Sequence, residues 1–355
     1  MYVTEQGAYV RKKGPHLHVV KDEELLADVP LKDVQCVVVF GGVHVTTDAL
    51  AALVDEGCDI AFMTINGHFK ARVVSAHGKN SVLRVKQYEA FIDAGKKLSM
   101  ARKYVAAKIL NGCDVLYDYH RNRGNPFTFE NRGKLLDMAD KALQAETLQS
   151  LRGYEGTAAR LYFEGFGKCL MHGRTFPGRI FHPSTDPVNA LLSFGYSFVA
   201  RELEAALVAA GLDPYIGFFH DVTYGRASLS LDLMEEFRHP LVDRLVLKLF
   251  NRTLLDDNDF ETGESGQVYL KKESLKIFIR HYEEWANTVN RTYNNDGEMS
   301  WRKAMWKQVE KLRSCIEHDS EYTPFSWKEH HEAEPTAHAA NTTAVEKEMN
   351  AHNTA

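Results

Sequence analysis

The spacing of apolar and polar positions changes character near residue 80. Before that point, short apolar runs alternate with Gly, Asn and Pro turns, as is typical of β-strands, and Asn66-Gly67 is the clearest hairpin signal. One short helix is expected at Asp48–Glu56, capped by Thr46 or Thr47. The expected strands include Ala8–Arg11, Leu17–Val20, Cys36–Phe40, Ile60–Thr64 and Phe69–Val74. Residues 1–75 are therefore predicted to form a small β domain.

From Leu83 to about Glu317, apolar residues recur three and four positions apart, which predicts helices. The polar stretch 76–82 is expected to link the β domain to an α-helical domain of residues 83–325. The predicted helices are Leu83–Ala94, Leu98–Leu110, Asn131–Glu146, Leu148–Met171, Pro187–Ala210, Leu229–Phe250 and Leu275–Val289. His239-Pro240 is expected to interrupt the helix Leu229–Phe250, because Pro240 cannot donate to the carbonyl of Glu236. The fold class is thus predicted to be α+β, with a small β-rich domain followed by a larger all-α catalytic domain.

Charge is distributed unevenly along the chain. The formal net charge is −5, yet residues 70–124 carry twelve Lys/Arg against four Asp/Glu. On charge alone, a solvated helix face and a phosphate-binding surface explain this basic stretch equally well. Residues 326–355 are acidic and contain little that could be buried, so we expect a disordered tail.

Several classes of protein are not favoured. No apolar run approaches the roughly 20 residues of a membrane span, and the N-terminus lacks the apolar core of a signal peptide, so we expect a soluble, cytoplasmic protein. The five cysteines are scattered and never spaced as CxxC, which indicates neither a zinc site nor a disulfide framework. No phosphate-loop or dinucleotide-binding motif occurs, so no nucleotide cofactor is expected.

The residues richest in possible chemistry lie between 217 and 238. His220 ends an apolar stretch, and the helix that follows opens with Asp232, Glu235 and Glu236 on one face. Neighbouring acids repel each other unless a cation compensates them, and carboxylates with one imidazole suit Mg²⁺ or Mn²⁺. From the spacing alone, a core histidine followed by acids that the helix dipole favours is at least as good an interpretation.

Glu155 is the third carboxylate that would favour a metal site. It is a lone acid on an otherwise apolar helix face, and Gly153 and Gly156 flank it, which suits the close approach of a large ligand. Alternatively, Glu155 forms an ion pair with Arg152 or Arg160.

These segments also carry a resemblance to a known family. LRGYEGTAARLYF (151–163), DPVNALLSFGYSFVARELEAALVAAGLDPYIGFFH (186–220) and SLDLMEEFR (230–238) resemble the CRISPR-associated integrase family, the larger of the two universal spacer-acquisition proteins. VTEQGAYVRKKG (3–14) and TTDALAALVDEGCDIAFMTINGHFKARVV (46–74) resemble its N-terminal β domain. The resemblance covers roughly residues 1–320.

The resemblance implies three metal ligands, which carry over to Glu155, His220 and Glu235. It also implies a supporting role for Asp232, although Asp232 and Glu236 compete with Glu235 for the last ligand position. Losing one of these crowded acids is expected to keep or raise the stability of the metal-free protein. Six arginines near the motifs either bind DNA phosphates or form surface salt bridges: Arg152, Arg160, Arg174, Arg179, Arg226 and Arg238.

The implied function is that of a divalent-metal-dependent DNA integrase or endonuclease. It would insert captured foreign DNA into a CRISPR array when a 3′-hydroxyl attacks a repeat-boundary phosphate, with Mg²⁺ or Mn²⁺ as cofactor. The implied partners are double-stranded DNA, a second copy bound through the β domain, and a small second adaptation protein that bridges two dimers. In the sequence, only the apolar run Val34–Phe40 hints at dimerisation. The alternatives are a stand-alone metal-dependent nuclease on branched DNA and a non-catalytic DNA-binding scaffold.

Overall fold

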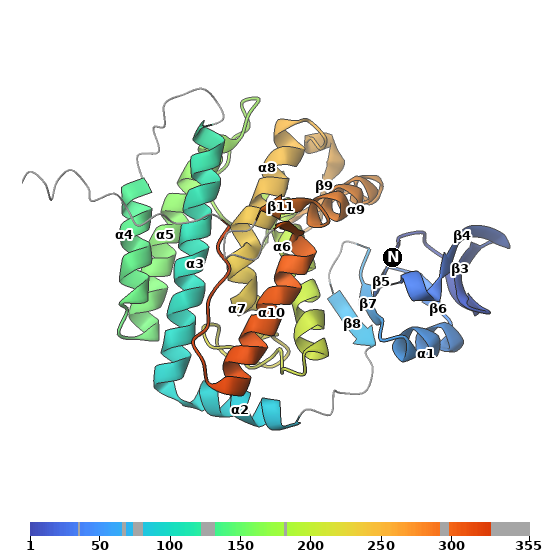
Figure 1. The fold of residues 1–355 in the computed structure, drawn as a ribbon. Helices are drawn as coiled ribbons and strands as arrows, with labels where there is room; N and C mark the ends of the chain where they lie inside the picture. Colours follow the sequence, from blue (N-terminus) through green and yellow to red (C-terminus); the bar gives the residue numbers. More distant parts are fainter. Residues whose placement is uncertain are drawn as a thin grey trace, which may run out of the picture.

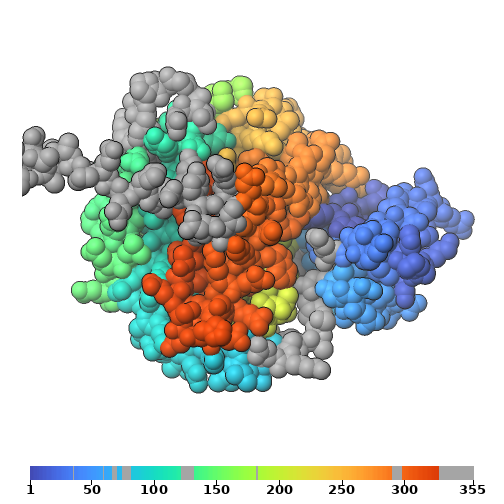
Figure 2. Space-filling model, viewed as in Figure 1, coloured from blue at the N-terminus to red at the C-terminus, as the bar shows by residue number. Residues whose placement is uncertain are grey.

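A β-rich part is followed by a mostly helical part, as predicted (Figure 1). The computed structural model describes residues 1–34, 36–65, 69–73, 81–121, 132–180, 183–291 and 298–327. The predicted Asn66-Gly67 hairpin turn, residues 76–80 of the predicted linker and all but the first two residues of the predicted tail lie outside these ranges. Figure 2 shows the β-rich part as a lobe beside the larger helical body.

Two four-stranded sheets build the β-rich part. One has the order β1-β5-β7-β8, in which only β8 runs antiparallel to its neighbour, and the other has the order β4-β3-β2-β6. The strands are β1 (Tyr2–Val3), β2 (Tyr9–Lys13), β3 (His16–Lys21), β4 (Glu24–Pro30), β5 (Cys36–Phe40), β6 (His44–Val45), β7 (Asp59–Met63) and β8 (Phe69–Val73). Helix α1 (Thr47–Asp55) is confirmed, and the Thr46 hydroxyl caps it by accepting from the Ala49 N–H.

Burial inside this lobe accounts for the apolar strand that hinted at dimerisation. Strand β5 pairs with β1 on one side and β7 on the other. Val37 and Val39 are buried in the core of the lobe, and Phe40 is buried in the larger core that includes the helical part. The apolar character of β5 is therefore explained within one chain, and it no longer serves as an argument for a dimer.

The helical part contains longer and more varied elements than predicted. The helix expected at Leu98–Leu110 is the 28-residue α3 (Ala94–Arg121), and α2 (Ser81–Ile92) begins inside the predicted linker. Two short antiparallel strand pairs and the last helix were not predicted. The remaining elements are α4 (Arg132–Leu143), α5 (Leu148–Cys169), α6 (Pro187–Ala209), β9 (Phe260–Thr262), β10 (Val268–Leu270), α9 (Lys272–Ala286), β11 (Val289–Arg291), β12 (Glu298–Ser300) and α10 (Trp301–His318), with short 3₁₀ turns at Leu31–Asp33 (η1) and Asp257–Asp259 (η3).

The predicted interruption of the helix Leu229–Phe250 at His239-Pro240 is confirmed. Helix α7 (Ser228–Phe237) passes into a π-helical segment, η2 (Arg238–Asp243), and then into α8 (Arg244–Asn251). Pro240 has no backbone N–H to donate to the carbonyl of Glu236, and its ring crowds that carbonyl, so regular α-helix cannot continue there. A wider π turn absorbs this mismatch.

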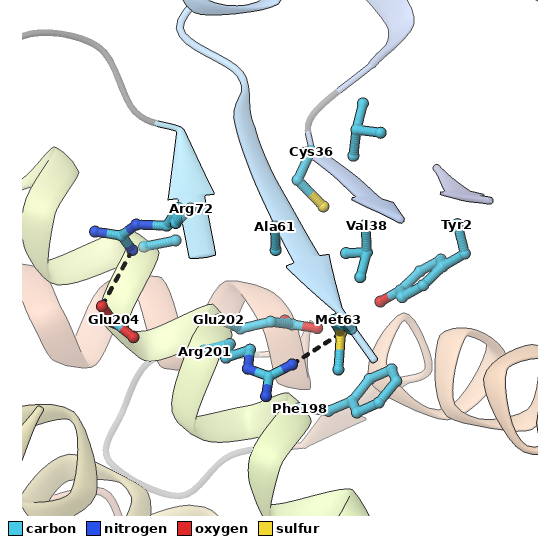
Figure 3. A pocket seen from close by; sticks show the side chains of 12 residues that line it. Tyr2, Cys36, Val38, Ala61, Met63, Arg72, Phe198, Arg201, Glu202 and Glu204 are labelled. Carbon is cyan, nitrogen blue, oxygen red and sulfur yellow. Dashed lines mark hydrogen bonds and ion pairs between the residues drawn. The ribbon is translucent and has the colours of Figure 1, made fainter. Parts of the chain in front are cut away.

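The two parts meet along α6 (Figure 3). The Tyr2 ring stacks on Phe198 with the ring centroids 5.9 Å apart, and Arg201 donates to the Met63 sulfur at 2.8 Å. The side chains at this junction enclose a small pocket of about 90 Å³. Because the contact combines ring stacking with polar contacts, α6 holds the β-rich lobe against the helical body.

The chain after α10 runs back over the helical body as an extended strap, residues 319–327. Phe325 stacks on Phe237 at 4.6 Å, and the buried Trp327 donates its backbone N–H to Asn111. The prediction that the tail begins at residue 326 is therefore wrong, because Trp327 belongs to the core. Within the described ranges, no helix combines the length and apolar character needed to cross a lipid bilayer.

The strap also explains part of the basic stretch. Lys96 and Lys103 pair with Asp319 and Glu321 of the strap, and Lys86 donates to the carbonyl of Glu317. These lysines therefore meet acidic or carbonyl partners of the same chain, an arrangement that neither interpretation of the basic stretch had anticipated.

Candidate active site

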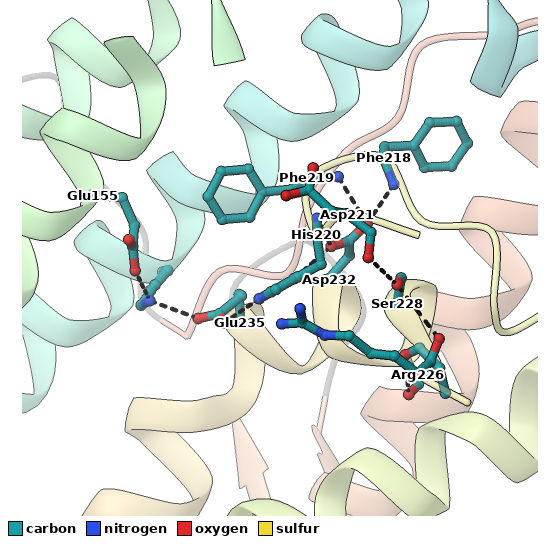
Figure 4. A network of polar contacts seen from close by, with 12 residues as sticks. Glu155, Phe218, Phe219, His220, Asp221, Arg226, Ser228, Asp232 and Glu235 are labelled. Atoms are coloured by element: carbon teal, nitrogen blue, oxygen red, sulfur yellow. Dashed lines mark hydrogen bonds and ion pairs between the residues drawn. The ribbon is translucent and has the colours of Figure 1, made fainter. Parts of the chain in front are cut away.

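Three segments far apart in the sequence bring the predicted metal ligands together (Figure 4). Glu155 lies on α5 and Glu235 on α7, and α3 packs against both helices. His220 lies in an irregular loop, residues 212–227, and not directly after a strand. Its Nε2 atom is 3.8 Å from Glu235 Oε1.

Lys108 of α3 reaches the middle of this group, which the sequence analysis did not predict. Its ammonium contacts the Glu155 carboxylate and lies 2.9 Å from Glu235 Oε2. Only 5% of the Lys108 side chain is exposed. The alternative that Glu155 pairs with Arg152 or Arg160 is therefore wrong, and the two carboxylates share one buried cation.

The donor set fits a divalent metal of the Mg²⁺ or Mn²⁺ type. Among the described residues, no three His, Cys, Asp or Glu side chains already stand as a preformed metal cluster. The lysine ammonium nevertheless marks a position where Glu155 and Glu235 converge on positive charge beside His220 Nε2. Two carboxylates and one imidazole, completed by water or phosphate oxygens, are ligands that these metals accept.

Asp232 holds the His220 loop instead of facing the shared cation. Its carboxylate accepts hydrogen bonds from the backbone N–H groups of Phe218, Phe219 and His220. It also forms a hydrogen bond of 2.7 Å with Nδ1 of the His220 ring. A Cβ at Gly217 would lie only 2.7 Å from Asp232 Oδ2, so the turn that delivers these donors needs glycine there. Asp232 thus fixes the loop and the ring together.

Glu235 is ionised in this environment. Burial, the largest influence, raises its pKa, but the nearby Arg238 and Lys108 more than offset burial and hold the pKa at about 2. Arg238 Nη1 is 3.2 Å from Glu235 Oε2. The carboxylate therefore keeps its negative charge, as a metal ligand requires, throughout the neutral range.

Glu236, the competing acid, points to a different part of the molecule. It accepts the Tyr322 hydroxyl at 2.7 Å and the Phe325 N–H at 2.6 Å, so it anchors the strap. Burial raises its pKa to about 8, although these two hydrogen bonds act in the opposite direction. The three acids of α7 therefore have three separate sets of partners.

A buried polar network behind the site was missed from the sequence. Asp243 accepts the hydroxyls of Tyr162 and Tyr196 and Nδ1 of His239, at 2.6 to 2.8 Å. Arg238 lies 4.4 Å over the Tyr196 ring and so connects the network to Glu235. The four-residue spacing of His239 and Asp243 was the available signal for it. Burial, the main influence, lowers the pKa of His239, which favours the neutral ring.

The six arginines proposed as phosphate contacts divide into two groups. Four have partners within the chain: Arg152 pairs with Asp221, Arg174 with Asp257, Arg238 with Glu235, and Arg179 donates to Asn189 and Ser193. Arg160 and Arg226 are exposed. In Figure 4 the Arg226 side chain extends from its loop in the direction of His220.

A groove of about 900 Å³ runs from Glu155 along α5 to the segment 174–179. Its lining includes four basic side chains, Arg160, Lys168, Arg174 and Arg179, against two acids, Glu155 and Glu164, the second of which pairs with Lys168. A basic groove that begins at a carboxylate site suits an extended anionic ligand.

Fold and site together define an α+β protein in which a β-rich part precedes a helical part that carries a carboxylate–histidine site beside a groove lined by basic side chains. The chain belongs to the Cas1 family, because the family model described as "CRISPR associated protein Cas1" matches residues 1–284. The resemblance that the sequence segments indicated is thereby confirmed.

Similar proteins agree with this assignment. A CRISPR-associated endonuclease Cas1 of Thermus thermophilus is 39% identical over 285 residues, which cover 80% of this chain and 83% of that protein. A casposase bound to its integration product has a TM-score of 0.81 at 23% identity, covering 97% of this chain and 98% of that one. A chain of a Cas6-RT-Cas1–Cas2 complex has a TM-score of 0.76 at 23% identity, covering 93% of this chain but 36% of that one. At these identities, the two structures show a shared fold.

Proposed function

We propose that this chain is a divalent-metal-dependent DNA integrase and endonuclease that inserts captured foreign DNA into a CRISPR array. The observation that carries the proposal is that Glu155 and Glu235 meet at one buried cation, with His220 Nε2 3.8 Å from Glu235, in a member of the Cas1 family. The name of the Thermus relative, an endonuclease, the integration product bound to the casposase, and a similar structure described as a TtCas1–DNA complex support a DNA substrate.

The reaction would be a phosphoryl transfer. The 3′-hydroxyl of a captured fragment attacks a phosphate at the repeat boundary, a new phosphodiester bond forms, and the bond to the original neighbouring 3′ oxygen breaks. A bound Mg²⁺ or Mn²⁺ would neutralise charge that develops on the phosphate and leaving oxygens. No nucleotide cofactor is needed, because one phosphodiester bond replaces another.

The residues of the site would have three roles: metal binding, orientation of the histidine ring and DNA-phosphate binding. Glu155, His220 and Glu235 would hold the metal, and Asp232 keeps the His220 ring oriented through the Nδ1 hydrogen bond. Arg160, at the groove, would bind DNA phosphates, as would Arg226 near His220. Arg152, Arg174, Arg179 and Arg238 already have partners in the chain, so their main roles would be structural.

The proposed assembly is a homodimer joined through the β-rich part, with a small second adaptation protein bridging two dimers. The occurrence of a chain of this fold in a complex named for both Cas1 and Cas2 supports the second partner.

Strand transfer tests this proposal directly. The purified chain, its small partner and Mg²⁺ or Mn²⁺ should join a short duplex with free 3′-hydroxyls to a repeat-containing plasmid. EDTA and Glu155→Gln should each abolish joining, whereas Glu310→Gln, an exposed position on α10, should not. Cutting without joining would indicate the stand-alone nuclease. DNA binding without any metal-dependent reaction would indicate the scaffold.

A further inference from the structure

Lys108 has no role in the proposed reaction, although its ammonium lies between two of the proposed metal ligands. It sits on the buried side of α3, one turn after Tyr104 and one turn before Asn111. Buried lysines are rare unless they are paired, and this one is paired with both Glu155 and Glu235. Its ammonium stands between two carboxylates that come from different helices.

We infer that the Lys108 ammonium holds the position of the divalent metal in the metal-free protein and is displaced when the metal binds. The lysine then sets the metal concentration at which the site becomes loaded. The inference rests on the proposed function, in which Glu155, His220 and Glu235 are the metal ligands.

The charges of the two carboxylates support this role for the Lys108 ammonium. Without a cation, the Glu155 and Glu235 carboxylates would repel each other across the site. One lysine charge offsets that repulsion and keeps both side chains directed at a common point. A divalent ion at the same point cannot coexist with the ammonium, because two cations a few ångströms apart repel strongly in a buried site.

The second cation at Glu235 is held differently. Arg238 lies 3.2 Å from Glu235 and packs over the Tyr196 ring, so it is fixed from two sides. Lys108 has a flexible unbranched side chain whose ammonium has only the two carboxylates as ionic partners among the described residues. Lys108 is therefore the cation that leaves, and Arg238 the one that stays.

Direct Mn²⁺ binding to the full chain tests the inference without relying on catalysis. By isothermal titration calorimetry, Lys108→Gln should bind Mn²⁺ about tenfold more tightly than wild type, or better, because the competing charge is gone. In EDTA the variant should melt at a lower temperature than wild type, and saturating Mn²⁺ should remove that deficit. Lys103→Gln is the matched control: it lies on the same helix and pairs with Glu321, so its Mn²⁺ affinity should equal that of wild type.

The outcomes separate the two proposals. Mn²⁺ binding that survives Glu155→Gln unchanged would remove the proposed metal site itself. Binding that is lost in Glu155→Gln but unaltered or weaker in Lys108→Gln would overturn only the placeholder role. If Lys108→Gln does not fold, amine labelling of wild type decides: Lys108 should be protected in EDTA and react once Mn²⁺ is added. Continued protection in saturating Mn²⁺ would refute the displacement.

Discussion

The Asp232 carboxylate forms a 2.7 Å hydrogen bond with Nδ1 of the His220 ring and also accepts hydrogen bonds from three consecutive backbone N–H groups, the last of which belongs to His220. An ionised carboxylate only accepts hydrogen bonds, so this contact places the ring proton on Nδ1. The other ring nitrogen, Nε2, lies on the side of Glu235, 3.8 Å from its Oε1. Asp232 therefore sets both the tautomer and the direction of the imidazole.

Asp232→Asn should lower strand-transfer activity and Mn²⁺ affinity by roughly 10- to 100-fold, as is usual when the partner of a metal-bound histidine is changed. The amide can donate as well as accept, so it no longer enforces the Nδ1–H tautomer. Asp221→Asn, at an exposed acid paired with Arg152, is the control and should stay close to wild type. Equal activity in the two variants would show that Asp232 does not orient His220.

Glu235→Ala should abolish strand transfer and also destabilise the metal-free protein, by about 3 kcal/mol, because Lys108 and Arg238 would lose a buried partner. This reverses the expectation, based on repulsion among neighbouring acids, that stability would hold or rise. Those acids do not face one another but have separate partners. Urea denaturation in EDTA measures the change, and a variant as stable as wild type would restore the repulsion argument.

Glu236 should make stability fall as the pH rises. Its pKa is about 8 in the folded chain against an ordinary value of 4.5, so the folded state holds the proton more tightly. The stability that Glu236 contributes is therefore fully present below about pH 4.5 and is lost as the pH rises through 8. Between pH 5.5 and 8.5, wild type should lose at least about 1.4 kcal/mol more than Glu236→Gln, the equivalent of one pKa unit. Parallel pH profiles in denaturant titrations would contradict the raised pKa.

Arg160→Ala should weaken DNA binding uniformly across sequences and reduce the slope of log affinity against log salt concentration by about 1, since one phosphate contact is lost. Fluorescence anisotropy at several salt concentrations gives both quantities. Arg313→Ala is the control, since Arg313 is an exposed arginine on α10 paired with Glu317. An unchanged salt slope in Arg160→Ala would exclude a phosphate at this end of the groove.

Truncation separates the strap from the remainder of the tail. A chain that ends at Trp327 should fold and integrate like the full chain, because the composition of residues 328–355 offers little to bury. A chain that ends at Pro324 loses Phe325 and Trp327, which are buried against Phe237 and Arg244, and should be less stable by roughly 3 kcal/mol or more. Thermal unfolding distinguishes the two, and equal melting temperatures would show that the strap contributes nothing.

Local patterns predicted those features whose partners are close in sequence. The Thr46 cap of α1 and the helix that carries Asp232, Glu235 and Glu236 depend on spacings of three or four residues. The different roles of the three acids were not predictable in this way. Glu236 meets Tyr322, 86 residues further along the chain, and no local spacing carries that information.

The sequence contained a signal for Lys108 that our prediction did not use. It was counted within a basic stretch, although it is a lone charge on an apolar helix face with Ala101, Tyr104 and Val115. The same reasoning that singled out Glu155 on α5 applies to it. Its partners, 47 and 127 positions away, could be identified only once α3, α5 and α7 were packed together.

The hydrogen bonds between Glu236 and the strap determine when, during synthesis of the chain, this buried acid can obtain its donors. Among the described residues, the buried carboxylate of Glu236, next to Glu235 on α7, accepts hydrogen bonds from Tyr322 and Phe325. On a ribosome, these two residues emerge after every other element of the helical part. Completion of these two hydrogen bonds therefore waits for residues 322–325, and a chain that stops before residue 322 keeps a buried acid without these donors.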